Sequence, residues 1–201
     1  MTAEQRMAQT LKGIATEFRR RKIAFAIVGG LAVSARARPR FTQDIDLAVA
    51  VESDADAEAV VLNLVRSGYR VLAQVEQTRT GRLATVRLQR KDVPEAPVID
   101  LLFASCGIEP EIVAAAELLE LFPRIVVPVA RVEHLLAMKL LSRDPRTRQQ
   151  DDLYVSALLQ GLSLPDADKV TEALRLMTQR GFNHRRRLLA TWNRIRPHRS
   201  T

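Results

Sequence analysis

The sequence predicts an α/β fold in which a mixed sheet is followed by a helical C-terminal part. Between residues 23 and 103, short apolar runs of strand length alternate with a helical pattern near residues 55–67. From residue 131 to 195 the apolar spacing is helical, with breaks at 161–165 and at Gly181. We therefore expect two regions: residues 1–128 hold the sheet and an N-terminal helix, and residues 129–201 hold helices and a basic tail.

The elements follow from their apolar spacing, taken in chain order. Residues 3–21 predict a helix, because Leu11, Ile14, Ala15 and Phe18 fall on one face. The expected strands are short apolar or alternating runs, and they cover residues 24–28, 44–50, 69–76, 82–90 and 97–103. Thr80-Gly81 suits the turn of a hairpin between two of these strands.

Composition narrows the class of protein. The chain has 201 residues, of which 47% are hydrophobic, so it can bury one sizeable core. No apolar run approaches the roughly 18 residues of a membrane-spanning helix, and the first residues lack the apolar region of a signal peptide. The single cysteine, Cys106, has no partner for an internal disulfide and is expected to be a small buried hydrophobe. We therefore expect no membrane association and a reducing cytoplasm.

Two carboxylates on one expected strand carry the chemistry. Side chains alternate between the faces of a strand, so Asp44 and Asp46 project from one face while Ile45 and Leu47 point to the other. Hard cations such as Mg²⁺ take oxygen ligands, and paired ions can activate an attacking oxygen while they stabilise a leaving pyrophosphate. This pattern predicts a metal-dependent nucleotidyl-transfer site with two Mg²⁺ ions.

A Gly-Gly turn precedes these carboxylates by thirteen residues. Gly29 and Gly30 directly follow the apolar run 24–28, and glycine there lets the backbone turn sharply into a helix and come close to a ligand. The N–H groups at the helix start can then face phosphate oxygens. Each motif alone is weak, because Gly-Gly is most often a tight turn and Asp-x-Asp is most often a solvated strand end or a helix cap. Their order and spacing together are far more specific.

A third carboxylate is required, because two metal ions need more negative ligands than two aspartates supply. Asp100 is the candidate, since it lies within the apolar run 98–103. A lone carboxylate in such a run is costly to bury unless it is paired or binds a metal. The alternative is a strand end at which Asp100 is open to water.

The two motifs resemble those of the DNA polymerase beta-like nucleotidyltransferase superfamily, and more narrowly those of the AbiEii and MenT type of toxin nucleotidyltransferases. The family pattern has a Gly-Gly turn, an Arg-x-Thr-x-Asp-x-Asp strand, a later strand with a third Asp, and a helical segment with Lys and Asp. The matching stretches are Val28-Gly29-Gly30-Leu31-Ala32 and Arg40-Phe41-Thr42-Gln43-Asp44-Ile45-Asp46-Leu47. The resemblance implies a mixed-sheet nucleotidyltransferase core with a helical C-terminal part.

The resemblance also implies roles for individual residues. Asp44 and Asp46 would hold both Mg²⁺ ions, and Asp100 would bind one of them and help to deprotonate the acceptor hydroxyl. Gly29 and Gly30, with Ser34 on the next helical turn, would cradle the triphosphate of the NTP substrate. Arg40 or Lys139 would offset the charge of that triphosphate.

The downstream segment matches the family less tightly. Lys139 falls on the apolar face of a helix expected near 132–141, where a lysine either extends its ammonium to water or points into a site. The resemblance favours contact with a nucleotide phosphate. Asp151 matches the trailing family Asp, although Asp152 is an equal alternative from one sequence. Tyr154 stands where the family often has another Asp, and this departure leaves the role of the segment open.

The formal net charge of +8 comes from the C-terminal tail, because residues 175–201 contain eight arginines, no lysine and no acid. Arginines interleaved with Phe182 and Trp192 suit a phosphate backbone with occasional stacking, and Arg185, Arg186 and Arg187 form the expected RNA-binding cluster. The alternatives are a surface for an acidic partner protein or a solvated end with no specific role.

These observations predict transfer of NMP from an NTP to a hydroxyl acceptor. The MenT resemblance implies the 3′ end of tRNA as acceptor and a toxin–antitoxin pair, with an antitoxin protein as partner. An antibiotic-modifying nucleotidyltransferase would share the site but needs an acidic pocket for a cationic drug, which the basic tail argues against. A non-catalytic binding module on the same fold would follow if any of the three aspartates pointed away from the site.

Overall fold

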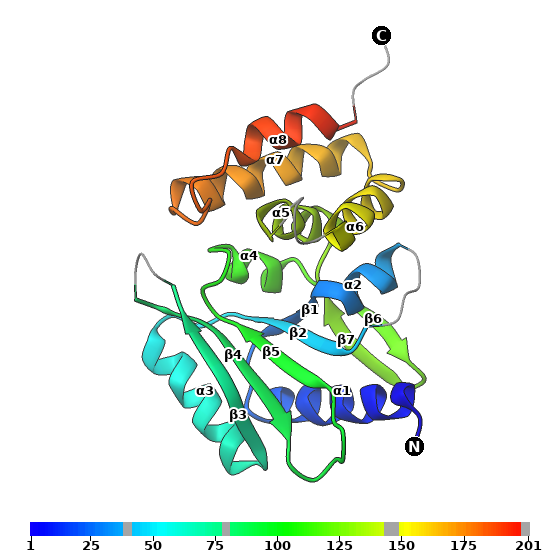
Figure 1. The fold of residues 1–201 in the computed structure, drawn as a ribbon, viewed down its shortest axis with the longest axis vertical. Helices are drawn as coiled ribbons and strands as arrows, with labels where there is room; N and C mark the ends of the chain where they lie inside the picture. Colours follow the sequence, from blue (N-terminus) through cyan, green and yellow to red (C-terminus); the bar gives the residue numbers. More distant parts are fainter. Residues whose placement is uncertain (38–41, 78–80, 143–148, 198–201) are drawn as a thin grey trace.

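The computed structural model describes residues 1–37, 42–77, 81–142 and 149–197, without the side chains of residues 149–151. Its strands are β1 (Phe25–Val28), β2 (Asp44–Val49), β3 (Tyr69–Glu76), β4 (Leu83–Arg90), β5 (Val98–Leu102), β6 (Glu117–Phe122) and β7 (Ile125–Val129). In the described chain these seven strands form one mixed sheet, in the order β3-β4-β5-β2-β1-β7-β6 (Figure 1). The predicted α/β class with a mixed sheet is confirmed.

Helices cover the sheet and extend beyond one of its ends. The helices are α1 (Ala3–Arg20), α2 (Gly29–Arg36), α3 (Asp54–Arg66), α4 (Glu109–Ala114), α5 (Val132–Ser142), α6 (Gln149–Leu159), α7 (Leu164–Gln179) and α8 (Leu188–Ile195). In Figure 1, α1 and α3 lie beside the lower part of the sheet, and α2 and α4 lie between its upper end and the helices α5–α8. Among the described residues, no helix has the length and apolarity needed to cross a bilayer.

The central strands explain the position of the core. All four residues of β1 are buried, as expected for a strand covered on both faces. In β2, Ile45 and Leu47 are fully buried while Asp44 and Asp46 are partly exposed, so the alternation predicted from the sequence is present. The buried faces of β1 and β2 therefore fix which way the two carboxylates point.

Some elements were not anticipated from the sequence. The hairpin β6–β7 and the short helix α4 fill a stretch for which no strand or helix was expected. Thr80 of the expected turn lies outside the described residues, whereas Gly81 adopts φ +67° beside the antiparallel pair β3–β4. Strand β7 ends at Val129 and α5 begins at Val132. The division into two regions at residues 128 and 129 stays a prediction.

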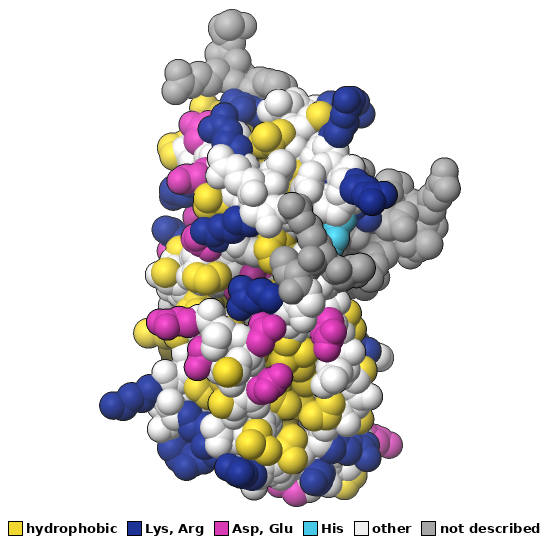
Figure 2. Space-filling model, turned by 90° about the vertical axis from the view of Figure 1, so that its left-hand side faces the viewer, with side chains coloured by type: hydrophobic (Ala, Val, Ile, Leu, Met, Phe, Trp, Pro, Cys, Tyr) yellow, Lys and Arg dark blue, Asp and Glu magenta, His cyan; other side chains and the backbone are white. Residues whose placement is uncertain are grey.

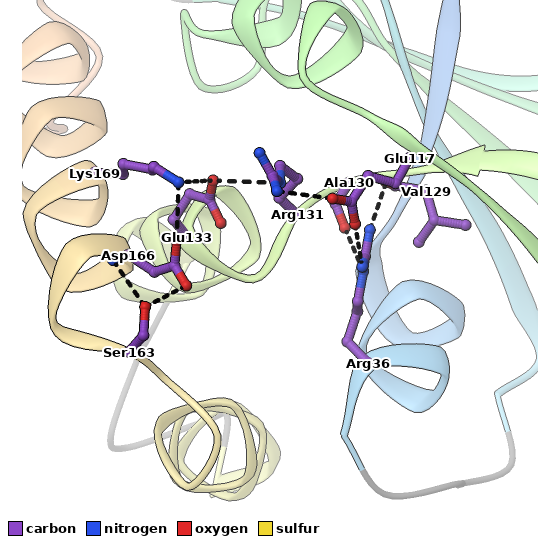
Figure 3. Close-up of polar contacts among 9 residues, drawn as sticks. All are labelled: Arg36, Glu117, Val129, Ala130, Arg131, Glu133, Ser163, Asp166 and Lys169. Atoms are coloured by element: carbon purple, nitrogen blue, oxygen red, sulfur yellow. Dashed lines mark hydrogen bonds and ion pairs between the residues drawn. The ribbon is translucent and has the colours of Figure 1, made fainter.

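A chain of ion pairs joins the sheet to the helical part (Figure 3). Arg36 on α2 contacts the Glu117 carboxylate at 2.6 Å, and Arg131 contacts the same carboxylate at 2.8 Å. Arg131 also lies 3.8 Å from Glu133, which in turn lies 3.9 Å from the Lys169 ammonium on α7. Exposed pairs of this kind contribute little each, but the Glu133 carboxylate is buried and needs its cations. The chain of charges therefore runs from α2 to α7.

Glu109 fixes the loop between β5 and α4. Its buried carboxylate accepts hydrogen bonds from the backbone N–H groups of Ser105, Cys106 and Gly107 at 2.6, 2.7 and 2.9 Å, and from the Ser105 hydroxyl at 2.9 Å. One side chain thus satisfies the donors of three successive residues. This loop adjoins the Asp100 strand, so its shape bears on the site.

We predict that Glu109→Gln lowers the free energy of unfolding by about 1–3 kcal/mol, because an amide N–H₂ would face a backbone donor. Glu109→Ala, which removes every acceptor, should lower it further. Urea unfolding measures both. Glu58→Gln on the exposed face of α3 is the control and should stay within about 0.5 kcal/mol of the unmodified protein. Equal effects at the two glutamates would contradict the anchoring role.

Candidate active site

Two neighbouring strands bring three carboxylates to one face of the sheet. In the parallel pair β2–β5, Asp46 lies directly opposite Asp100, and Asp44 lies opposite Val98. Directly paired residues on adjacent strands, about 4.8 Å apart, project to the same face, as do residues two apart on one strand. Burial raises the pKa of both Asp44 and Asp46, and the negative charge of Asp100 adds to the shift, which reflects this proximity.

The Gly-Gly turn seats the Asp46 carboxylate against the start of α2. Gly29 has φ +62°, and a Cβ atom there would lie 1.8 Å from the Asp46 Oδ2 atom. The backbone N–H of Gly30 donates a hydrogen bond to the same carboxylate. A Cβ atom on Gly30 would lie 2.9 Å from the Thr42 hydroxyl and 3.3 Å from the Tyr154 hydroxyl. Glycine is therefore required at both positions, because neighbouring side chains approach the backbone too closely for a Cβ atom.

Burial and mutual repulsion raise the pKa of Asp44 and Asp46. Burial, together with the Asp100 charge, raises the pKa of Asp46 to about 6, although the Lys139 ammonium opposes the shift. Burial is also the main cause of the raised pKa of Asp44, and the Asp100 charge adds to it while the Arg87 guanidinium opposes it. The ionised forms of both carboxylates are therefore destabilised in this site, and a bound cation would stabilise them.

Arg87 on β4 holds the third carboxylate. Its Nε and Nη2 atoms donate to the two Asp100 oxygens at 2.9 and 2.7 Å, a bidentate pair. Asp100 is 8% exposed, so the partner satisfies a carboxylate that is nearly out of water. Arg87 could not be recognised from the sequence, because only the β4–β5 register, which places Arg87 opposite Asp100, shows its role.

The donor set suits Mg²⁺ even though Asp100 is paired with Arg87. In the described part of the chain, no group of three or more His, Cys, Asp or Glu side chains is arranged to hold a metal ion. The three aspartates nevertheless offer only oxygen donors. Burial and the Asp100 charge raise the pKa of Asp44 and Asp46, and a divalent cation would relieve both effects. The donor types therefore fit Mg²⁺, and binding by all three aspartates requires Asp100 to exchange Arg87 for the ion.

Lys139 points into the site from the helical part. It lines a cavity of about 590 Å³ that Gly29 and Asp46 also line, and its ammonium lies 4.7 Å from the centroid of the Tyr154 ring. Tyr154, the departure from the family pattern, thus contacts the lysine through its ring and approaches Gly30 with its hydroxyl. The side chain of Asp151 lies outside the described residues, so the structure does not test its expected role beside Lys139.

The cavity has walls from both regions of the chain. The lining combines residues of β1, β2, β4, β5, the start of α2, the loop after β5, helix α5 and a C-terminal turn. It comprises Val28, Gly29, Asp46, Thr85, Leu102, Ser105, Cys106, Leu135, Met138, Lys139, Leu141, Ser142, His184 and Arg186. Cys106 is buried as expected, and burial raises the pKa of its thiol well above the usual range. The thiol is therefore protonated at neutral pH.

The remaining site residues predicted from the sequence divide into three groups. Ser34 lines a separate cavity of about 680 Å³ with Thr42 and residues of α1 and β6. Arg40 lies outside the described residues. Arg186 lines the Asp46 cavity, whereas Arg185 and Arg187 are exposed and do not contribute to its lining. The structure therefore does not bring Ser34 to the same cavity as Asp46.

We predict that Gly29→Ala displaces the Asp46 carboxylate and lowers the free energy of unfolding by more than about 2 kcal/mol, because positive φ strain and a clash act together. Gly81→Ala is the matched control, since Gly81 has φ +67° but open space around its Cβ position. Its loss should be limited to the roughly 1–2 kcal/mol of strain. Urea unfolding of both variants separates the clash from the strain, and equal losses would refute the close contact.

We predict that Asp46→Asn stabilises the metal-free protein, and increasingly so as the pH rises. A carboxyl whose pKa is about 6 in the fold and 3.8 ordinarily binds its proton more tightly when folded, so its contribution to stability is lost as the pH rises from 4 to 6. Asparagine does not titrate. In EDTA, the advantage of Asp46→Asn should grow by about 1 kcal/mol between pH 5 and pH 8. An advantage that is independent of pH would contradict this prediction, and exposed Asp168→Asn serves as control.

Solved structures share this fold. The antibiotic-resistance factor ANT(2″)-Ia in solution is 18% identical, with a TM-score of 0.56, and the match covers 90% of this chain and 94% of that one. ANT(2″)-Ia in complex with adenylyl-2″-tobramycin is 18% identical with a TM-score of 0.53, covering 87% and 99%. An antigenic nucleotidyltransferase-like protein from Paracoccidioides brasiliensis is 17% identical with a TM-score of 0.53, covering 94% of each chain. No curated protein matches the sequence.

One family model spans most of the chain. Residues 15–193 match the family described as "Nucleotidyl transferase AbiEii toxin, Type IV TA system". The matched range includes the Gly-Gly turn, the three aspartates, Lys139 and the C-terminal turn at the cavity. This match confirms the resemblance inferred from the two motifs, and the chain belongs to the AbiEii family of nucleotidyltransferase toxins.

Proposed function

We propose that this nucleotidyltransferase moves an NMP group from an NTP to a hydroxyl at the 3′ end of tRNA, with Mg²⁺ bound at Asp44, Asp46 and Asp100. The observation that carries the proposal is the pairing of Asp46 with Asp100 across β2 and β5, directly beside the Gly29–Gly30 turn. Lys139 lines the same cavity from the helical part. The Asp46 carboxylate and the Lys139 ammonium thus share one cavity with the start of α2, and all three suit nucleotidyl transfer.

The reaction replaces one P–O bond by another. The acceptor oxygen forms a bond to the α-phosphorus, the bond to the bridging oxygen breaks, and pyrophosphate leaves with that electron pair. Mg²⁺ would activate the acceptor and neutralise the charge on the leaving group. Asp100, released from Arg87, would take the acceptor proton, and Lys139 would contact the phosphates. The backbone N–H of Gly30 donates a hydrogen bond to the Asp46 carboxylate. The other N–H groups at the start of α2 would donate to phosphate oxygens.

Charge around the cavity supports a polyanionic acceptor. Arg185 and Arg187 are exposed on either side of Arg186, which lines the cavity. In Figure 2, Lys and Arg side chains are spread over both the upper and the lower part of the visible face, with acidic side chains among them. A strand of RNA that reaches the cavity with its 3′ end would pass basic side chains. An acidic antitoxin protein would suit the same surface.

An antibiotic acceptor is the second candidate, favoured by the fold likeness to ANT(2″)-Ia, which was solved with adenylyl-2″-tobramycin. A cationic drug needs carboxylates in its pocket. Among the described lining residues the acids are limited to Asp46, whereas Lys139 and Arg186 are basic. The cavity therefore suits an anionic acceptor better than a cationic one.

The test is to incubate the protein with each labelled NTP, Mg²⁺ and total tRNA, and to follow label in the RNA. We expect incorporation from at least one NTP, and none in EDTA. Asp46→Ala and Lys139→Ala should each lower the rate by about 100-fold or more, because charge in the transition state is then left unneutralised. Asp168→Ala, at an exposed position on α7, should transfer at the normal rate.

Three results would contradict parts of the proposal. Transfer to tobramycin but not to RNA would favour the antibiotic reaction. Full activity of Asp46→Ala would remove the metal assignment. NTP binding without transfer to any acceptor would favour a non-catalytic binding module.

A further inference from the structure

The segment between α7 and α8, residues 180–187, is fixed to the sheet region. The Arg180 guanidinium donates to the Gly107 carbonyl at 2.6 Å and forms a bidentate pair with Glu111 at 2.6 and 3.0 Å. Phe182 is buried, and its ring lies so close that a Cβ atom on Gly107 would be 2.3 Å from it. A polar clamp and an aromatic contact thus attach the start of this segment to the end of the loop that Glu109 organises.

The rest of the segment folds into a tight turn. The Arg186 N–H donates to the Asn183 carbonyl at 2.8 Å, and the Asn183 side-chain amide donates back to the Arg186 carbonyl at 3.2 Å. Between them His184 and Arg185 adopt φ +48° and +60°, which non-glycine residues rarely do. Leu188, at the first position of α8, is buried and anchors the far side. The turn is therefore held at both ends and across its middle.

This shape separates neighbouring arginines. His184 and Arg186 line the cavity that contains Asp46 and Lys139, whereas Arg185 and Arg187 do not. From the sequence the three arginines form one basic run, but only the middle one reaches the cavity. The described lining has four ionisable side chains besides the buried thiol of Cys106, namely Asp46, Lys139, His184 and Arg186. Basic groups therefore outnumber acidic ones.

We propose that Arg186, assisted by His184, binds the β- and γ-phosphates of the nucleoside triphosphate, so that the C-terminal turn supplies part of the nucleotide site. The inference rests on the proposed function. A cavity of about 590 Å³ is of the size that holds small-molecule cofactors and substrates. A guanidinium presents a planar fork of donors that matches two phosphate oxygens, and an ammonium such as that of Lys139 cannot reproduce this geometry.

The charge of the substrate supports the same assignment. A triphosphate carries about four negative charges near neutral pH, more than Lys139 alone can offset. The terminal phosphates are also the part of the substrate that leaves as pyrophosphate, and a positive group there stabilises the departing charge. Arg186 lies at the exposed rim of the cavity, where pyrophosphate can depart to solvent. Arg185 and Arg187 remain available to an RNA backbone.

The test is to titrate inorganic triphosphate, each of the four NTPs and the corresponding NMPs into the protein by calorimetry. Arg186→Gln should weaken binding of inorganic triphosphate and of the NTPs by about 10- to 100-fold, the usual effect of losing charged hydrogen bonds. Binding of the NMPs should change little, because they lack the β- and γ-phosphates. Arg186→Lys should recover only part of the loss. Arg66→Gln, exposed on α3, controls for the lost charge and should bind triphosphate normally.

RNA binding gives the second arm of the experiment. The double variant Arg185→Gln, Arg187→Gln should weaken tRNA binding. The slope of log affinity against log salt concentration should become shallower by about 0.7 per lost phosphate contact. Its affinity for triphosphate should not change. The inference is overturned if Arg186→Gln leaves triphosphate binding intact. It is also overturned if Arg186→Gln weakens triphosphate binding no more than the double variant of Arg185 and Arg187 does. Transfer of label to tRNA by the unmodified protein would then still uphold the proposed function. Failure of the unmodified protein to bind any NTP would overturn both.

Discussion

The contact between the Asp46 carboxylate and the backbone of Gly29 and Gly30 is the constraint on which the rest of the site depends. Nothing larger than a hydrogen atom fits on Gly29, since a Cβ atom would lie 1.8 Å from Asp46 Oδ2. The contact ties the end of β1, the start of α2 and the middle of β2 to one geometry. Because β5 pairs with β2 in parallel register, Asp100 is then placed opposite Asp46, and Arg87 opposite Asp100. The arrangement of charges follows from strand pairing around this one contact.

This arrangement destabilises the ionised forms of Asp44 and Asp46. Asp46 is half-buried beside Asp100 and near Asp44, and its pKa of about 6 means that the fold stabilises its charged form poorly. Two cations from different regions limit this cost: Arg87 on β4 pairs with Asp100, and Lys139 on α5 acts on Asp46. A divalent ion among the aspartates would provide the neutralisation that these side chains provide only in part. The protein thus keeps a locally unfavourable cluster because the surrounding sheet determines its position.

The sequence was sufficient for the elements with strong local signals. The alternation in 44–47 placed Ile45 and Leu47 inside and both aspartates on the other face. The apolar face of the expected helix near 132–141 left Lys139 either extended to water or pointing into a site, and the family resemblance favoured the site. What could not be predicted depends on register and on distant contacts. Arg87 is one arginine among many until β4 is paired with β5. Tyr154 looked like a departure from the family pattern, yet its ring lies 4.7 Å from the Lys139 ammonium. The hairpin β6–β7 turns at Pro123-Arg124, where Arg124 adopts φ +64°, and no strands were expected on either side of this turn. Ser34, expected at the phosphates, lines another cavity instead.

The C-terminal turn illustrates why a run of like residues need not act as a unit. Local sequence gives Arg185, Arg186 and Arg187 the same charge and the same neighbours, so composition alone assigns them one role. Their positions are decided instead by Arg180 and Phe182, which contact Gly107 some seventy residues earlier in the chain. That loop is held by Glu109, whose carboxylate accepts the N–H groups of three successive residues. The orientation of a surface arginine therefore depends on a buried glutamate beside the strand of Asp100. The helical part thus forms one wall of the Asp46 cavity and is more than an appendage to the sheet.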